Sequence, residues 1–143
     1  KYPSDIELCV VEGLPYNEYI KVMRDSDIIL DQLYSYTPSM NSLKAMSLGI
    51  ICMGGGEEEG YNIIHEKKLR PIINVQPSYD SVYMALEKIV LHSDQIPELK
   101  RQSIEYVTKY HDYLHVAKQY EDLYHGILSG QEKKRKNLQI TNY

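Results

Sequence analysis

Between Tyr34 and Tyr61 the chain reads YSYTPSMNSLKAMSLGIICMGGGEEEGY. The order of these residues predicts a turn, a short amphipathic helix, a buried strand and a glycine loop. Apolar side chains at helical spacing form one face of the helix, and Gly49 is suited to end it. The apolar run at residues 50–53 is typical of a strand buried on both faces, as in a parallel sheet. This stretch therefore predicts an α/β fold.

Strands and helices are expected to alternate along the whole chain. Apolar runs predict strands at residues 6–11, 27–31, 50–53 and 71–75. Periodicity and capping residues predict further helices at residues 15–24, 62–66, 78–92, 97–110 and 112–128. This alternation predicts a Rossmann-like parallel sheet with helices on both faces and right-handed crossovers. We expect one domain over residues 1–130 and a polar basic tail over residues 131–143.

The composition argues against several classes of protein. The chain has 143 residues and a net charge of -4, and because no basic stripe outweighs the acidic residues we expect no nucleic-acid partner. No apolar run approaches the roughly 20 residues that span a bilayer, and there is no signal peptide, so we expect a cytoplasmic location. Cys9 and Cys52 lie in expected strands, where burial in a reducing compartment is predicted. The chain starts at Lys1 without an initiator Met, so we expect it to be a piece of a longer protein.

The start of the helix that follows residue 36 is suited to hold an anion. Pro38 is pre-set for a first helical turn, and either Thr37 or Ser39 can cap the free amides. Amides at such a start carry partial positive charge and can hold a phosphate group.

A second candidate site is the glycine loop. Gly54, Gly55 and Gly56 bring bare backbone to the carboxyl end of a predicted strand, the edge at which open α/β sheets bind ligands. Glu57 and Glu59 follow these glycines. Their carboxylates are candidates for the same site, although an acidic turn that faces solvent is an equally good interpretation.

Other ligand-binding motifs fit poorly. The glycine loop lacks both the spacing of a dinucleotide-binding loop and the Gly-Lys-Ser/Thr of a P-loop. His111, Asp112 and His115 have a spacing similar to part of a zinc-protease motif. Asp112 is better suited to cap the last helix, which leaves His111 outside it and separates the two imidazoles. We therefore expect no bound metal.

Three patterns along the chain belong together: Ser26-Asp27-Ile28, Leu43-x-Ala45-Met46-x-x-Gly49 and Gly54-Gly55-Gly56-x-x-Glu59. With these patterns the chain resembles the nucleotide-binding half of GT-B glycosyltransferases. It is most similar to family four, the retaining enzymes called glycosyltransferase group 1. The sequences of residues 31–41 and 69–78 are similar to those of a Bacteroides-type subgroup that builds surface polysaccharides. The similarity extends over roughly residues 6–124.

The resemblance implies transfer of a sugar from a nucleotide-diphosphate donor to a glycan or lipid-linked acceptor. The acceptor would bind an N-terminal domain that this chain does not contain, and the full-length enzyme could be peripheral to the inner membrane. No cofactor or metal is expected, because the nucleotide-sugar is a substrate and catalysis consists mainly of stabilising the diphosphate leaving group. Catalytic residues are not assigned. The implied donor-binding residues are Tyr36, Ser39, Met40, Asn41, Lys44, Gly54, Gly55, Gly56, Glu57 and Glu59.

The chain departs from the family at two positions. Tyr36 and Lys44 stand where the family usually carries glutamates that hold the donor sugar and ribose. Two alternatives therefore stay open, a non-catalytic GT-B-like binding or assembly module and a nucleotide-sugar epimerase on the same fold. In the family the strand before residue 6 lies between the strands matching residues 6–11 and 27–31. Because it is missing here, we expect residues 6–11 to pair with residues 27–31 or with a second copy, which would give a homodimer.

Overall fold

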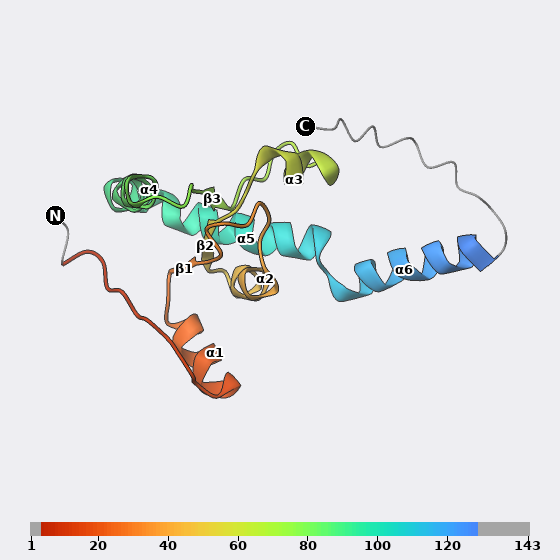
Figure 1. Ribbon diagram of the computed structural model, residues 1–143, viewed down its shortest axis with the longest axis horizontal. Helices are drawn as coiled ribbons and strands as arrows, with labels where there is room; N and C mark the ends of the chain where they lie inside the picture. Colours follow the sequence, from red (N-terminus) through yellow and green to blue (C-terminus); the bar gives the residue numbers. More distant parts are fainter. Residues whose placement is uncertain (1–3, 129–143) are drawn as a thin grey trace.

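The computed structural model describes residues 4–128, so the tail predicted for residues 131–143 lies outside the described residues. Figure 1 shows a small sheet at the centre, with helices around it and the last helix extending away from the sheet. The elements in chain order are α1 (Tyr16–Arg24), β1 (Ile28–Leu30), α2 (Met40–Ser47), β2 (Ile51–Gly54), α3 (Glu58–Ile63), β3 (Ile73–Asn74), α4 (Tyr79–Leu91), the 3-10 helix η1 (Ser93–Gln95), α5 (Ile96–Tyr110) and α6 (Tyr113–Leu128).

The sheet has three strands in the order β1-β2-β3, and both pairs are parallel. Ile29 of β1 lies opposite Cys52 of β2, and Met53 of β2 lies opposite Ile73 of β3. The connection from β1 to β2 contains α2, and that from β2 to β3 contains α3. The predicted α/β class with a parallel sheet is confirmed.

The strand predicted at residues 6–11 is wrong. These residues form no strand and pair with none of the three strands of the sheet. Leu8 and Val10 are 80% and 81% exposed, and Cys9, predicted to be buried, is exposed. Apolar residues favour a strand only where a partner supplies backbone hydrogen bonds. Pairing of residues 6–11 with β1 does not occur, whereas the pairing with a second copy stays a prediction.

The core surrounds β2. All four residues of β2 are buried, as predicted from the apolar run, and both α2 and α5 contact this strand. One cluster joins Cys52 to Met46 of α2, Tyr61 of α3 and Tyr106 of α5, and the two tyrosine rings meet edge-on with centroids 5.9 Å apart. Burial raises the pKa of the Cys52 thiol to about 11, so this cysteine is a small apolar core residue.

A second cluster holds α1 against α2. It consists of Ile20 and Met23 of α1, Ala45 of α2 and Ile50 just before β2. Since α2 contributes to both clusters, its position relative to the sheet and to α1 is fixed by burial of apolar area.

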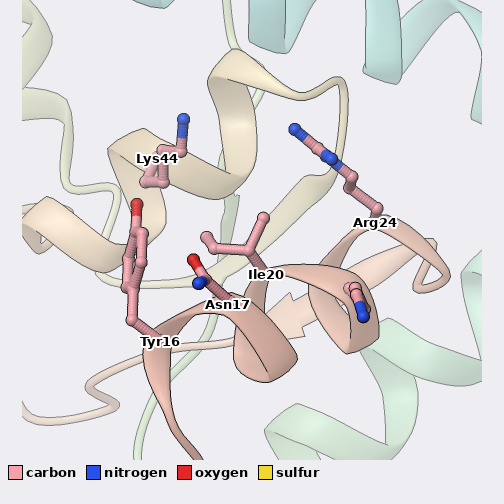
Figure 2. A pocket seen from close by; sticks show the side chains of 6 residues that line it. Tyr16, Asn17, Ile20, Arg24 and Lys44 are labelled. Carbon is pink, nitrogen blue, oxygen red and sulfur yellow. The ribbon is translucent and has the colours of Figure 1, made fainter.

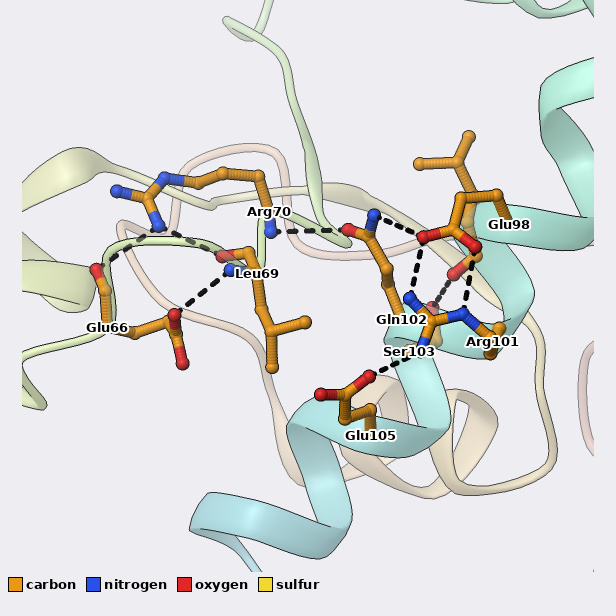
Figure 3. Close-up of polar contacts among 9 residues, drawn as sticks. Glu66, Leu69, Arg70, Glu98, Arg101, Gln102, Ser103 and Glu105 are labelled. Atoms are coloured by element: carbon orange, nitrogen blue, oxygen red, sulfur yellow. Dashed lines mark hydrogen bonds and ion pairs between the residues drawn. The ribbon is translucent and has the colours of Figure 1, made fainter.

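A buried carboxylate ties the segment after α3 to α5. Figure 3 shows its hydrogen bond to the amide of Leu69, and the neighbouring bond from the amide of Arg70 to Gln102 of α5. Glu66 is 4% exposed, and one of its oxygens accepts hydrogen bonds from the amides of Lys68 and Leu69 at 2.6 and 3.0 Å. The other oxygen accepts from Lys109 Nζ at 2.7 Å and from the Tyr110 hydroxyl. The Lys109 and Tyr110 contacts, with the two amides, hold the pKa of Glu66 well below its usual range. This charge is tolerated in the interior because its oxygens are hydrogen-bonded.

The short helix predicted at residues 62–66 begins four residues earlier, at Glu58. The reason is electrostatic, because Glu58 and Glu59 occupy the first turn, where the helix dipole favours negative charge. The helix ends at Ile63, and two residues later the φ of His65, 57°, lies in the left-handed region. The amides of His65 and Glu66 bond back to the carbonyls of Asn62 and Tyr61 at 3.1 and 2.9 Å, a pattern that usually has glycine at this position.

The remaining helices agree with the sequence analysis. Ser78 caps α4 by accepting a hydrogen bond from the amide of Ser81. Asp112 caps α6, because its Oδ1 accepts from the amides of Leu114 and His115, each at 3.1 Å. The interpretation of Asp112 as a helix cap is confirmed.

We predict that His65→Gly stabilises the protein by about 1 kcal/mol, because glycine adopts the left-handed conformation without the steric cost that a side chain meets there. Urea unfolding measures the change in the free energy of unfolding. His92→Gly is the matched control, since His92 ends α4 with a φ of -127° and gains no such relief. A His65→Gly protein no more stable than wild type would contradict this account.

Candidate functional site

Three loops meet at the carboxyl edge of the sheet, and hydrogen bonds join them. The amide of Gly56, after β2, donates to Asn74 Oδ1, at the end of β3, at 3.1 Å. Gln76 Nε2, after β3, donates to Glu57 Oε1 at 3.3 Å. The amide of Glu57 donates to the carbonyl of Tyr36, in the loop after β1, at 3.4 Å. The loops that follow β1, β2 and β3 therefore form one connected surface.

The glycine loop packs directly on the backbone of its neighbours. A Cβ at Gly55 would lie 1.8 Å from the carbonyl oxygen of Ser35, and one at Gly56 would lie 2.7 Å from Ile72 Cγ2. Gly54 is the last residue of β2. This backbone was expected to be open for a ligand, but Gly55 lies against the loop after β1 and the amide of Gly56 donates to Asn74.

Ser39 and Asp31 together organise the start of α2. Ser39, and not Thr37, is the N-cap, because its Oγ accepts from the amide of Ser42 at 3.2 Å. Asp31, which follows β1, accepts from the amide of Ser39 at 3.0 Å and from its hydroxyl at 2.9 Å. A carboxylate of the protein thus already occupies part of the positive end of the helix.

The surroundings of Asp31 keep it ionised. Burial alone would raise the pKa of this carboxyl, but the nearby Ser42 hydroxyl, together with hydrogen bonds from Ser39 and Gln32, outweighs burial and lowers the pKa below the ordinary value of 3.8. The Ser42 side chain is fully buried, and its hydroxyl has no hydrogen bond of ordinary geometry among the described residues.

Two amides at the start of α2 stay open. The amides of Met40 and Asn41 have no hydrogen-bond partner among residues 4–128, as is usual for the first turn of a helix. The side chain of Met40 is exposed. The side chain of Asn41 is not free, since its Oδ1 accepts from the Tyr19 hydroxyl of α1 at 2.7 Å.

The other predicted site residues lie in different places. Tyr36 is exposed in the loop after β1, next to the glycine loop. Glu59 is exposed in the first turn of α3. Lys44 belongs to α2 but takes part in none of the contacts that join the three loops. Together with residues of α1 it lines a cleft between the two helices (Figure 2).

The sequence analysis missed two features of this region. It placed Asp31 at the end of a strand at this edge but gave it no role at the start of α2. It gave no sign of the cleft, which depends on the packing of α1 on α2. Among residues 4–128, no group of three or more His, Cys, Asp or Glu side chains is arranged to hold a metal. In the same part of the chain, no helix combines the length and apolar character needed to cross a membrane.

The comparisons with known proteins add no relative. No family model matches the chain, and searches of curated proteins and of solved structures find no significant match. The geometry of the chain itself is therefore the basis for the functional conclusion.

We predict that Gly55→Ala lowers the free energy of unfolding by roughly 2 kcal/mol, because the added methyl group meets a backbone carbonyl that cannot move alone. Gly126→Ala is the matched control, since a Cβ at Gly126 meets nothing within 4 Å. In the helix interior this control is expected to be neutral or slightly stabilising. Urea unfolding of both variants gives the comparison, and equal stability of the two would rule out the close contact with Ser35.

We predict that Asp31→Asn lowers stability at neutral pH by about 0.5 kcal/mol, because an amide is a weaker partner for the helix start than a carboxylate. The folded-state pKa of Asp31 lies below 3.8, so its contribution is present above that pH and is lost as the pH falls through the folded value. The difference between the two proteins should therefore shrink in acid. Urea unfolding at a series of pH values measures it, and a difference that grew on acidification would refute the assignment.

Proposed function

We propose that the chain forms part of the donor-binding region of a GT-B glycosyltransferase, in which a Rossmann-like sheet carries the nucleotide-sugar. The reaction is the transfer of a sugar from a nucleotide-diphosphate donor to a glycan or lipid-linked acceptor. The observation that carries this proposal is the convergence of the three loops at the carboxyl edge, beside the open amides of Met40 and Asn41.

The chemistry of this edge suits a diphosphate attached to polar groups. Open amides at a helix start bind phosphate oxygens without a side chain. Glu57 and Gln76 place an acceptor and a donor next to each other at 3.3 Å, which suits recognition of sugar hydroxyls. Tyr36 offers an exposed aromatic face on the same surface, against which a sugar or base can pack.

The proposed role is binding and positioning. A diphosphate leaving group is stabilised by positive charge and by aligned amides. In this site the aligned amides are those at the start of α2. Additional cations would come from other parts of the enzyme. The donor is a substrate, and the proposal includes no cofactor.

A second candidate function is a non-catalytic binding or assembly module. The observation that favours it is the carboxylate of Asp31 at the start of α2, which accepts from Ser39 at 3.0 and 2.9 Å. A negative charge there opposes a second anion at the same end of the helix. The two candidates differ in whether a nucleotide diphosphate binds at all.

The deciding experiment is an NMR titration of the ¹⁵N-labelled protein with UDP and with GDP. Binding at the proposed site shifts the amide signals of Met40, Asn41 and Gly55, whereas uridine and guanosine, which lack the diphosphate, leave them in place. The Asp31→Asn protein is expected to bind the diphosphate more tightly, by roughly twofold to fivefold, because a repulsive charge is gone. Asp80→Asn removes the same charge from the exposed first turn of α4 and serves as the control. Unchanged signals at all three amides would favour the non-catalytic module.

A further inference from the structure

We propose that the cleft between α1 and α2 is a separate anion-binding site, which holds a phosphate group with Lys21, Arg24 and Lys44. This site goes beyond the proposed donor site. None of its lining residues belongs to the three loops at the carboxyl edge, so each site can be present without the other.

The cleft lies between α1, which supplies five of its lining residues, and α2, which supplies Lys44. It has a volume of about 530 Å³ and is lined by Tyr16, Asn17, Ile20, Lys21, Arg24 and Lys44. Figure 2 shows Ile20 between the side chains of Arg24 and Lys44, with Tyr16 and Asn17 nearer to Lys44. The floor is firm because Ile20 is only 9% exposed and packs in the cluster that joins α1 to α2. The packing of the two helices therefore fixes the backbone positions of Lys21, Arg24 and Lys44.

The charge of the cleft is of one sign. Three of its six lining residues are cationic and none is acidic. In the described part of the chain, Lys21, Arg24 and Lys44 form no ion pair, and the same holds for Lys67, Lys68 and Lys88, which lie outside the cleft. The cations in ion pairs include Arg70, Lys100, Arg101, Lys109 and Lys118.

Three cations gather in the cleft although the chain has a net charge of -4. Like charges repel one another, and a bound anion offsets that repulsion. The cleft thus concentrates positive potential on one side of an acidic protein, which attracts an anionic ligand.

The residue types favour phosphate. An Arg guanidinium can bind two phosphate oxygens at once, and Lys ammonium groups add point charges. The Tyr16 hydroxyl and the Asn17 amide supply neutral donors at the Lys44 side of the cleft. The cleft is open to solvent, so a phosphate group can enter it while the rest of a larger molecule stays outside. That molecule is either a soluble phosphate ester or a phospholipid headgroup.

The test compares pyrophosphate binding by two triple variants, using calorimetry on the purified protein. Lys21→Gln, Arg24→Gln and Lys44→Gln together remove the three cations of the cleft. Lys67→Gln, Lys68→Gln and Lys88→Gln remove the same total charge from residues that line no part of it. Circular dichroism establishes that both variants are folded. Should the first one unfold, the single variant Arg24→Gln replaces it and Lys88→Gln becomes its control.

The cleft variant is expected to bind pyrophosphate at least tenfold more weakly than wild type. A tenfold loss of affinity corresponds roughly to the free energy of one charge-assisted hydrogen bond. The control variant should lose much less. Equal loss in the two variants would overturn the proposal, because only the overall charge would then matter.

Sedimentation with vesicles of phosphatidylcholine and phosphatidylglycerol identifies the source of the phosphate group. Vesicle binding that the cleft variant loses and the control keeps assigns the site to a lipid headgroup, and pyrophosphate binding without vesicle binding assigns it to a soluble ester. No binding of either probe by the wild-type protein would refute the site. In the NMR titration, pyrophosphate should shift the signals of Asn17, Lys21 and Lys44, so failure here is distinguishable from failure of UDP or GDP to shift those of Met40 and Asn41.

Discussion

The burial of β2 is the constraint on which the rest of the structure depends. Ile51, Cys52 and Met53 are each 0% exposed, and because successive side chains of a strand point to opposite faces, neither face of β2 is open to water. Each fully buried side chain of this size contributes about 1.5–3 kcal/mol, so losing the cover on either face would be costly. The helices α2 and α5, which contact β2, supply this cover, and parallel strands pair with both of its edges. They also bring the ends of three strands, and their loops, to one edge.

At the carboxyl edge of the sheet the loops pack tightly, and the carboxylate of Asp31 competes with any external anion for the start of α2. Gly55 lies so close to Ser35 that no side chain fits between them, which holds the loops after β1 and β2 in one arrangement. Asp31 then uses its carboxylate to fix the start of α2. The same contact that makes the helix start rigid also lowers its attraction for an external phosphate. Rigidity and anion affinity are therefore in opposition at this position, and the balance depends on how many free amides remain.

The sequence indicated the features that depend on local chemistry. The caps Ser78 and Asp112 followed from side-chain oxygens placed just before apolar periodic runs, and the buried β2 followed from an unbroken apolar run. At α2 the sequence left Thr37 and Ser39 as alternatives, and only the structure selects Ser39. The prediction of a strand at residues 6–11 was wrong because a strand needs a partner for its backbone hydrogen bonds, and the segment's own sequence does not supply one. The cleft could not be predicted, since Lys21 and Arg24 come from one helix and Lys44 from another, and no sequence spacing brings them together.

The orientation of α2 connects the two proposed sites. Ser42, Ala45 and Met46 face inward and are fully buried, so the helix cannot rotate without exposing them. Its first turn then presents open amides at the carboxyl edge, while Lys44, between two of the buried positions, is directed to the cleft with α1. A helix of eight residues gains little stability from its own hydrogen bonds. Its orientation must therefore come from the clamp of Asp31 on Ser39 at one end and from packing against α1 and β2 along its side. Any change that loosens this packing should disturb the helix start and the cleft together, whereas a change confined to either set of polar groups should disturb only one.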